Sequence, residues 1–173
     1  MRNIGLFGLT GNPPHIGHLR AVEDALLSCE RVFVTPVFIH PFNKEFIEYE
    51  QRLKMITMLF QHLKSVDIIE LDKKFYMEKQ QIPYSYDLLT YIKQEKSIDA
   101  KLIIGEDNYK KEIWEKFYSY DKIDNEFGVI VIKDSGEHST QIRDFCKNKD
   151  WINVEKCCSP LVTAHIRDNL LYI

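Results

Sequence analysis

The apolar residues fall into two alternating patterns along the chain. Short apolar runs predict β-strands, and longer segments in which apolar residues recur every three or four positions predict helices. The predicted strands span residues 4–7, 31–39, 66–71, 101–104 and 127–132, and the predicted helices span residues 16–27, 49–63, 84–95, 107–118, 140–147 and 160–171. Residues 72–81 are mostly polar without a convincing period, so we expect a loop there.

This order of elements predicts an α/β fold. Strands that alternate with helices imply right-handed crossovers and a doubly wound, mostly parallel, Rossmann-like sheet of about five strands, closed by C-terminal helices. No internal repeat or linker divides residues 1–173, so we expect one domain. Polar motifs follow three of the predicted strands, at residues 8–18, 105–107 and 135–143. Ligands of such sheets bind beyond the carboxyl ends of the strands, which predicts one shared site.

The stretch GLFGLTGNPPHIGH, residues 5–18, carries the strongest chemical signal. His15 and His18 are three positions apart and share one face at the first turn of a helix, with Asn12 or a nearby polar group as the cap. A helix start also offers free backbone N–H groups and the positive end of the helix dipole, which suit phosphate. The pattern therefore favours phosphoryl-type chemistry over a loop with surface histidines.

A second motif lies near the end of the chain. Ser139 and Thr140 open a predicted helix, so hydroxyl and N–H groups can bind phosphate while Arg143 reaches back one turn. Taken alone, this motif favours a capped surface helix with an exposed arginine. It gains weight because it follows the paired histidines in the chain.

Together these motifs resemble the nucleotidylyltransferase superfamily, whose H-x-G-H signature is usually G-G-T-F-D-P-x-H-x-G-H. Ser85-Tyr86, residues 103–107 (I-I-G-E-D), Trp114 and residues 139–143 (S-T-Q-I-R) are similar, in the same order, to elements of bacterial nicotinate-nucleotide adenylyltransferases. The resemblance runs from Ile4 to the last residues of the chain.

The resemblance implies transfer of AMP from ATP to nicotinate mononucleotide, with release of pyrophosphate. His15, His18 and Arg143 would be catalytic, with His18 on the α-phosphate and Arg143 on the β- and γ-phosphates. The implied nucleotide-binding residues are Gly8, Leu9, Thr10, His15, His18, Lys44, Gly105, Asp107, Ser139, Thr140 and Arg143. Mg²⁺ would bridge the ATP phosphates, since the sequence has no carboxylate cluster that suggests a protein-built metal cage.

Ser85, Tyr86 and Trp114 would bind the acceptor, with Trp114 stacked on the nicotinate ring and Ser85 and Tyr86 meeting its carboxylate through backbone N–H groups. Several of these residues have structural alternatives. Thr10 could be a turn residue, Asp107 a helix cap and Trp114 a core side chain, since Ile113 and Phe117 beside it are apolar.

The chain departs from the superfamily pattern in the histidine loop and before Ser139. Leu9 replaces a glycine and Asn12 an aspartate. Only residues 133–138 stand where relatives place a longer segment with a strand, so we expect the sheet to lack that strand. The superfamily has P-P-H-K in the region of Lys44, whereas this chain has a reordered version, H-P-F-N-K, at residues 40–44. We expect His40 to be a loop residue. These departures leave open a nucleotide-binding module without turnover. Within the enzyme class, another acceptor, such as nicotinamide mononucleotide or phosphopantetheine, also stays open.

Composition narrows the partners further. The net charge of −3 gives no general attraction to nucleic acid or to anionic membranes, and no apolar run is long enough to cross a bilayer. Four cysteines show no C-x-x-C spacing, which favours reduced thiols and a cytoplasmic protein. The oligomeric state stays open.

Overall fold

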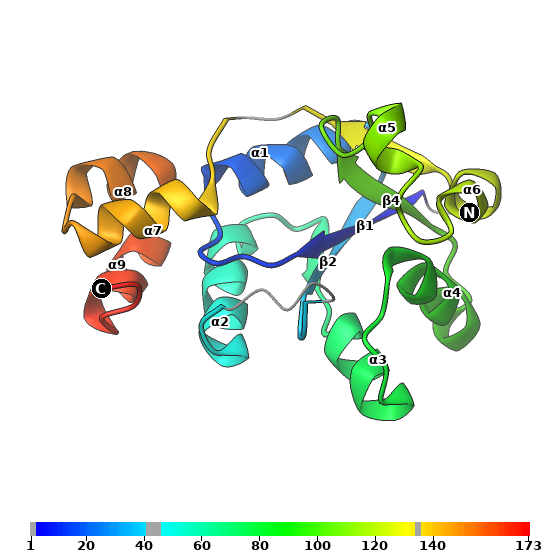
Figure 1. The fold of residues 1–173 in the computed structure, drawn as a ribbon, viewed down its shortest axis with the longest axis horizontal. Coiled ribbons are helices and arrows are strands. Elements are labelled where there is room, and N and C mark those ends of the chain that lie inside the picture. The colour runs from blue at the N-terminus through cyan, green and yellow to red at the C-terminus, as the bar shows by residue number, and fades with distance from the viewer. Residues whose placement is uncertain (1–2, 41–45, 134–135) are drawn as a thin grey trace.

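The computed structural model describes residues 3–40, 46–133 and 136–173. Its centre is a sheet of five strands, β1 (Ile4–Leu9), β2 (Arg31–Pro36), β3 (Val66–Ile68), β4 (Ala100–Gly105) and β5 (Val129–Ile132). The strands lie in the order β3-β2-β1-β4-β5, and every neighbouring pair is parallel. The predicted doubly wound α/β sheet is therefore confirmed, and the strand order reverses between β1 and β4 (Figure 1).

Helices connect the strands and cover both faces of the sheet. They are α1 (Ile16–Ala25), α2 (Tyr49–Phe60), α3 (Leu71–Lys79), α4 (Ser85–Lys96), α5 (Lys111–Trp114), α6 (Tyr120–Lys122), the π-helix η1 (Ile123–Phe127), α7 (Ser139–Lys147), α8 (Trp151–Cys157) and α9 (Pro160–Asp168). In the part of the chain that the structure describes, none of the helices is long and apolar enough to span a membrane.

Two apolar cores flank the sheet because its central strands bury side chains on both faces. Along β4, Ile103 packs with α1, α2 and α7–α9, whereas Leu102 and Ile104 pack with α3 and α4. β1 divides in the same way, with Leu9 in the first core and Leu6 in the second. This two-sided burial explains why the central strands read as continuous apolar runs.

The structure corrects the prediction for residues 72–81, which form most of α3 and not a loop. The helix buries Leu71 and Phe75, one turn apart, and also the polar residue Asp72. The Asp72 carboxylate accepts a hydrogen bond from the Phe38 N–H at 2.9 Å, and its own N–H donates to the Thr35 hydroxyl at 3.1 Å. Because Asp72 is buried together with Leu71 and Phe75, a polar residue stands on the core face of α3, and the apolar period of an amphipathic helix is not visible in the sequence.

Other elements also differ from prediction, among them α6 and η1, which the apolar pattern did not indicate. The helix expected over residues 107–118 is reduced to α5, which has four residues and follows a series of turns. α8 was not predicted, because Val154 is its one residue buried in the core. Its start is fixed by Asp150, whose carboxylate accepts a hydrogen bond from the Asn153 N–H.

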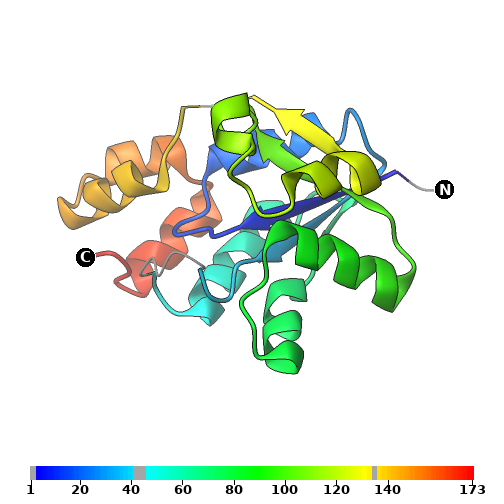
Figure 2. The ribbon, with the colours of Figure 1, turned by 45° about the vertical axis from the view of Figure 1, so that its right-hand side comes forward.

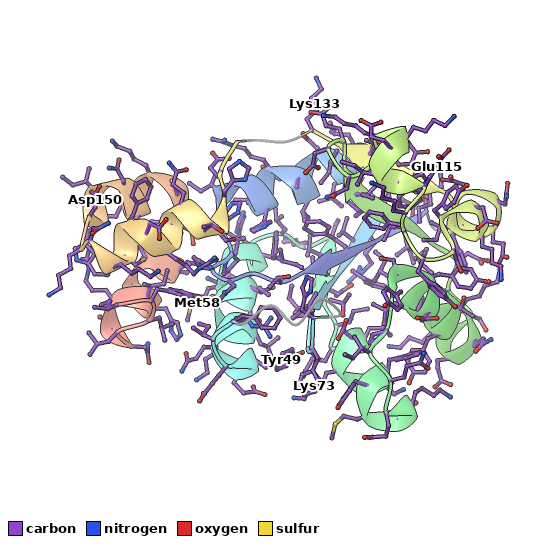
Figure 3. The ribbon with its side chains drawn as sticks, viewed as in Figure 1. Tyr49, Met58, Lys73, Glu115, Lys133 and Asp150 are labelled. Atoms are coloured by element: carbon purple, nitrogen blue, oxygen red, sulfur yellow. The ribbon has the colours of Figure 1, made fainter. Side chains whose placement is uncertain are left out.

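The last three helices pack beyond the carboxyl end of β1, next to α2 (Figures 1 and 2). The His165 ring on α9 lies 2.7 Å from the Gln51 side-chain oxygen on α2. Lys133, directly after β5, points away from the molecule (Figure 3). The chain thus leaves the sheet at β5 and returns at α7 to the side where β1 ends.

Arg52 is a buried arginine in α2 that joins three separate segments. Only 1% of its surface is exposed. Its Nη1 donates to the carbonyls of Thr10 and Val37, both at 2.8 Å, and its Nε donates to the Ile47 carbonyl at 3.2 Å. The guanidinium also lies 4.5 Å from the centre of the Phe46 ring. One side chain therefore ties the β1–α1 loop to the chain that leaves β2 and to the start of α2.

We expect Arg52→Met to lower the free energy of unfolding by roughly 3 kcal/mol or more, because each buried carbonyl left without a donor costs about 1–3 kcal/mol. Lys54→Met, at an exposed position of the same helix, should change it by no more than about 0.5 kcal/mol. Urea unfolding of both variants measures the difference. Equal stabilities would show that Arg52 does not hold these segments together.

Candidate active site

The histidine loop, residues 9–15, connects the end of β1 to the start of α1. His15 is the N-cap of α1, so of the predicted caps it is a nearby polar residue and not Asn12 that begins this helix. The His15 N–H donates to His18 Nδ1 at 3.1 Å, and the two imidazole rings stack with 3.7 Å between their centres. The predicted sharing of one helix face is therefore confirmed.

This hydrogen bond determines which nitrogen of the His18 ring carries the proton. A nitrogen that accepts a hydrogen bond from a backbone N–H carries no proton, so the neutral ring holds its proton on Nε2. Burial and the neighbouring His15 both lower the pKa of His18 well below its ordinary value, with burial the larger cause. His18 is thus neutral at physiological pH and has one N–H donor for a ligand.

Side chains from distant segments bind the backbone carbonyls of the histidine loop. Arg143 Nη1 donates to the Asn12 carbonyl at 2.7 Å, and the Ser139 hydroxyl donates to the Pro13 carbonyl at 2.9 Å. Both donors lie on α7, so the two motifs of the sequence converge. The capped surface helix with a solvent-exposed arginine is the wrong alternative, because Arg143 is half-buried against the loop.

Arg143 still has groups that can face a ligand. Its Nη2 donates to the Thr140 hydroxyl at 3.1 Å, and Thr140 itself is exposed. The first turn of α7 therefore places a hydroxyl, a guanidinium and backbone N–H groups beside the start of α1. Two helix N-termini with their partial positive charges meet at this point, which is an arrangement suited to a polyanion.

Gly105 ends β4, the neighbour of β1 at the reversal of strand order, and Asp107 follows two positions later. A Cβ on Gly105 would lie 2.5 Å from the carboxylate of Asp107, an exposed side chain that can turn away. Asp107 lies in an exposed turn, and the next helix begins only at Lys111. Helix capping therefore does not account for Asp107. Gly8, on β1, has open space where a side chain would stand.

Ser85 and Tyr86 open α4, the helix that leads into β4. The Tyr86 hydroxyl donates to the Glu126 carboxylate at 3.2 Å, and its ring packs against Phe127. The side chain is thus engaged with η1. The N–H groups in the first turn of a helix have no intrahelical acceptor, and they remain the groups through which this motif can bind an anion.

Trp114 is a buried side chain with 5% of its surface exposed. The indole N–H donates to the Asp124 carboxylate at 2.9 Å, and the rings of Tyr109 and Phe117 lie 5.3 and 5.1 Å away, centre to centre. The structure therefore shows the core packing that was the alternative for this residue. Stacking on a nicotinate ring stays a prediction.

Two further candidates, Lys44 and His40, come after β2 in the sequence. Lys44 is outside the described residues. His40 follows β2 in a loop, as predicted, and its ring centre lies 6.0 Å from that of Phe46. On α3, the Lys73 ammonium lies 4.8 Å from the centre of the Tyr49 ring (Figure 3).

Sequence reasoning missed Arg52 and Tyr172, both of which contact the histidine loop. The Tyr172 hydroxyl donates to the Asn12 side-chain oxygen at 2.9 Å. Arg52 shares the buried stripe of α2 with Ile56 and Leu59, so a charged residue at an apolar position was an available signal. Tyr172 follows α9 and had no comparable signal.

The described residues contain no group of three or more His, Cys, Asp or Glu side chains placed to hold a metal ion. The donors that surround the histidine loop include the Arg143 guanidinium, a group that binds anions.

This fold and site define a nucleotide-binding protein of the Rossmann-like α/β class. The chain belongs to the family described as Cytidylyltransferase-like, whose model matches residues 6–167, and it is therefore a nucleotidyltransferase.

Named relatives narrow the comparison. The chain is 30% identical over 170 residues to the "Probable nicotinate-nucleotide adenylyltransferase" of Campylobacter jejuni subsp. jejuni strain 81-176, with 91% of each chain covered. It is 27% identical over 200 residues to the nicotinate-nucleotide adenylyltransferase of Bacillus subtilis strain 168, with 99% of each covered. Its fold is similar to that of Plasmodium falciparum nicotinic acid mononucleotide adenylyltransferase complexed with NaAD, with a TM-score of 0.78 and 17% identity over 99% of this chain and 98% of that one.

The burial of Trp114 generates a test with two parts. Trp114→Ala should lower the free energy of unfolding by about 3–5 kcal/mol, as expected for removal of a core tryptophan, whereas Lys116→Ala at an exposed position should change it by no more than about 0.5 kcal/mol. If the indole also touches the acceptor, Trp114→Phe should raise the KM for nicotinate mononucleotide roughly tenfold more than the KM for ATP. Equal changes in both KM values would show that Trp114 has a structural role only and does not contact the acceptor.

Proposed function

We propose that the protein transfers AMP from ATP to nicotinate mononucleotide and releases pyrophosphate. One observation carries the proposal. The histidine loop holds His18 as a neutral ring with its proton on Nε2, and the start of α7 is hydrogen-bonded to the same loop. Relatives named nicotinate-nucleotide adenylyltransferase over 91% or more of both chains support the choice of acceptor.

The reaction is an in-line displacement at the α-phosphorus of ATP. A phosphate oxygen of the acceptor forms the new bond to this phosphorus as the bond to the bridging oxygen of the β-phosphate breaks, and pyrophosphate leaves with the electron pair. The acceptor phosphate is already a nucleophile, so no general base and no covalent intermediate are needed. The protein contributes positioning and charge stabilisation.

The triphosphate would lie where α1 and α7 begin. His18 would donate its Nε2 proton in a hydrogen bond to an α-phosphate oxygen, and His15 would contact the α- or β-phosphate. The backbone near Gly8, Leu9 and Thr10 would surround the same oxygens. Arg143, with Ser139 and Thr140, would bind the β- and γ-phosphates that become the leaving group.

The remaining candidates complete the two substrate sites. Gly105 and Asp107 would lie along the ATP ribose, and Lys44 would supply a further cation. The first-turn N–H groups of Ser85 and Tyr86 would meet the nicotinate carboxylate, with Trp114 against the ring. A carboxylate fits this helix start better than a neutral amide does, because the partial charge of a helix N-terminus is positive.

Enzymes of this family generally use a divalent metal with the phosphates of ATP. We propose Mg²⁺ for this chain, bound by phosphate oxygens, where it would neutralise charge on the leaving group. We further propose that residues 1–173 act as one nucleotidylyltransferase domain in the cytoplasm. The four cysteines are free thiols, which supports that compartment.

The direct test incubates the protein with ATP, Mg²⁺ and one acceptor at a time, namely nicotinate mononucleotide, nicotinamide mononucleotide or phosphopantetheine. We expect the highest kcat/KM with nicotinate mononucleotide, measured as dinucleotide and pyrophosphate formed in equal amounts. His18→Ala should lower kcat about 100- to 1000-fold, the usual cost of one preorganised donor, and change ATP affinity only a few-fold.

His62→Ala, at an exposed position after α2, is the matched control and should retain wild-type kcat. Preference for another acceptor would overturn the assignment of the substrate. Binding of ATP without turnover on any acceptor would make the chain a nucleotide-binding module.

A further inference from the structure

Tyr172, in the segment after α9, reaches into the histidine loop. Its hydroxyl donates to the Asn12 side-chain oxygen at 2.9 Å, across 160 positions of the chain. Asn12 is buried, with 7% of its surface exposed. The contact is therefore partly buried, which limits competition from water for the donor and acceptor.

The direction of this hydrogen bond is set by a second donor. The Ile47 N–H also donates to the Asn12 side-chain oxygen, at 3.4 Å, and an N–H group can only donate. The Tyr172 hydroxyl is a donor over the physiological range, since burial raises the pKa of this phenol and the opposing charges of Arg143 and Arg52 are the smaller causes. Asn12 thus accepts from two segments at one oxygen atom.

Asn12 also connects to the proposed catalytic groups. Its backbone carbonyl accepts from Arg143 Nη1 at 2.7 Å, and His15 follows three positions later as the N-cap of α1. Movement of Asn12 would therefore change the place of the Arg143 guanidinium relative to the two histidines. The distance between these groups matters because the α-phosphate and the leaving pyrophosphate must be held at the same time.

We propose that Tyr172 is a positioning residue for the transfer reaction, which acts through Asn12 to hold Arg143 and the His15–His18 turn in register. This inference rests on the proposed function. Tyr172 itself touches neither substrate in this account, because its hydroxyl is engaged by Asn12.

The test compares Tyr172→Phe with Leu170→Ala. The first change removes one oxygen atom and keeps the ring, and the second truncates a side chain in the same segment that is 72% exposed. Tyr172→Phe should lower kcat about three- to tenfold, the range for one neutral hydrogen bond, with KM for ATP within about twofold and the melting temperature within a few degrees. Leu170→Ala should match the wild type.

A double-mutant cycle separates positioning from a general loss of structure. If Tyr172 acts through Asn12, Tyr172→Phe should cause no further loss of kcat in an Asn12→Ala background. A kcat of Tyr172→Phe equal to that of the wild type would overturn the proposal. Losses that multiply in the double variant would overturn it as well.

Failure of the proposed function is recognised separately, by a wild-type protein that forms no dinucleotide. Positioning is then tested by hydrogen exchange of residues 9–18. We expect faster exchange in Tyr172→Phe than in the wild type, and wild-type exchange in Leu170→Ala. Unchanged exchange in Tyr172→Phe would contradict the proposal.

Discussion

The structure depends on the way the carbonyls of the histidine loop are hydrogen-bonded. Pro13 and Pro14 have no N–H groups, so this part of the loop cannot form the backbone hydrogen bonds that stabilise ordinary turns. Its residues 11–15 are nonetheless buried, and buried carbonyls require donors. Side chains of Ser139 and Arg143 supply donors to Pro13 and Asn12, and the Cys158 thiol lies 3.8 Å from the Pro14 carbonyl. Arg52 donates to the neighbouring carbonyl of Thr10.

This arrangement links catalysis to the whole fold. The donors come from α2, from α7 and from the residue after α8, all of which lie far after the loop in the sequence. The same contacts that make the loop rigid bring the start of α7 to the start of α1. Under the proposed function, phosphate-binding groups that are far apart in the sequence are held together by hydrogen bonds of the protein itself, which lowers the cost of binding.

The sequence predicted the parts of the structure that have a local cause. Strands buried on both faces are continuous apolar runs, and the His15–His18 spacing defines one face of a helix wherever that helix lies. The prediction that residues 8–18, 105–107 and 135–143 share one site followed from the topology of a parallel sheet. The hydrogen bonds of Ser139 and Arg143 to the histidine loop confirm it for the first and the last of these segments. These features need no knowledge of side-chain packing.

What the sequence did not predict depends on tertiary contacts. α3 buries the carboxylate of Asp72 against Phe38, and a polar residue turned inward looks like a loop in the sequence. Arg52 and Tyr172 act through hydrogen bonds to residues that lie 42 and 160 positions away. The burial of Trp114 likewise depends on Asp124 in a π-helix that the apolar pattern did not indicate.

The central claim is that the loop presents His18 as a neutral ring with its proton on Nε2. Nitrogen NMR of the histidine rings, with His18 assigned from its absence in His18→Ala, tests this claim directly. We predict that His18 is neutral at pH 6.5, that its proton is on Nε2, and that it titrates well below the ordinary value, because its pKa is lowered by burial and by His15. A His18 ring that is protonated at pH 6.5, or that carries its proton on Nδ1, would contradict the account.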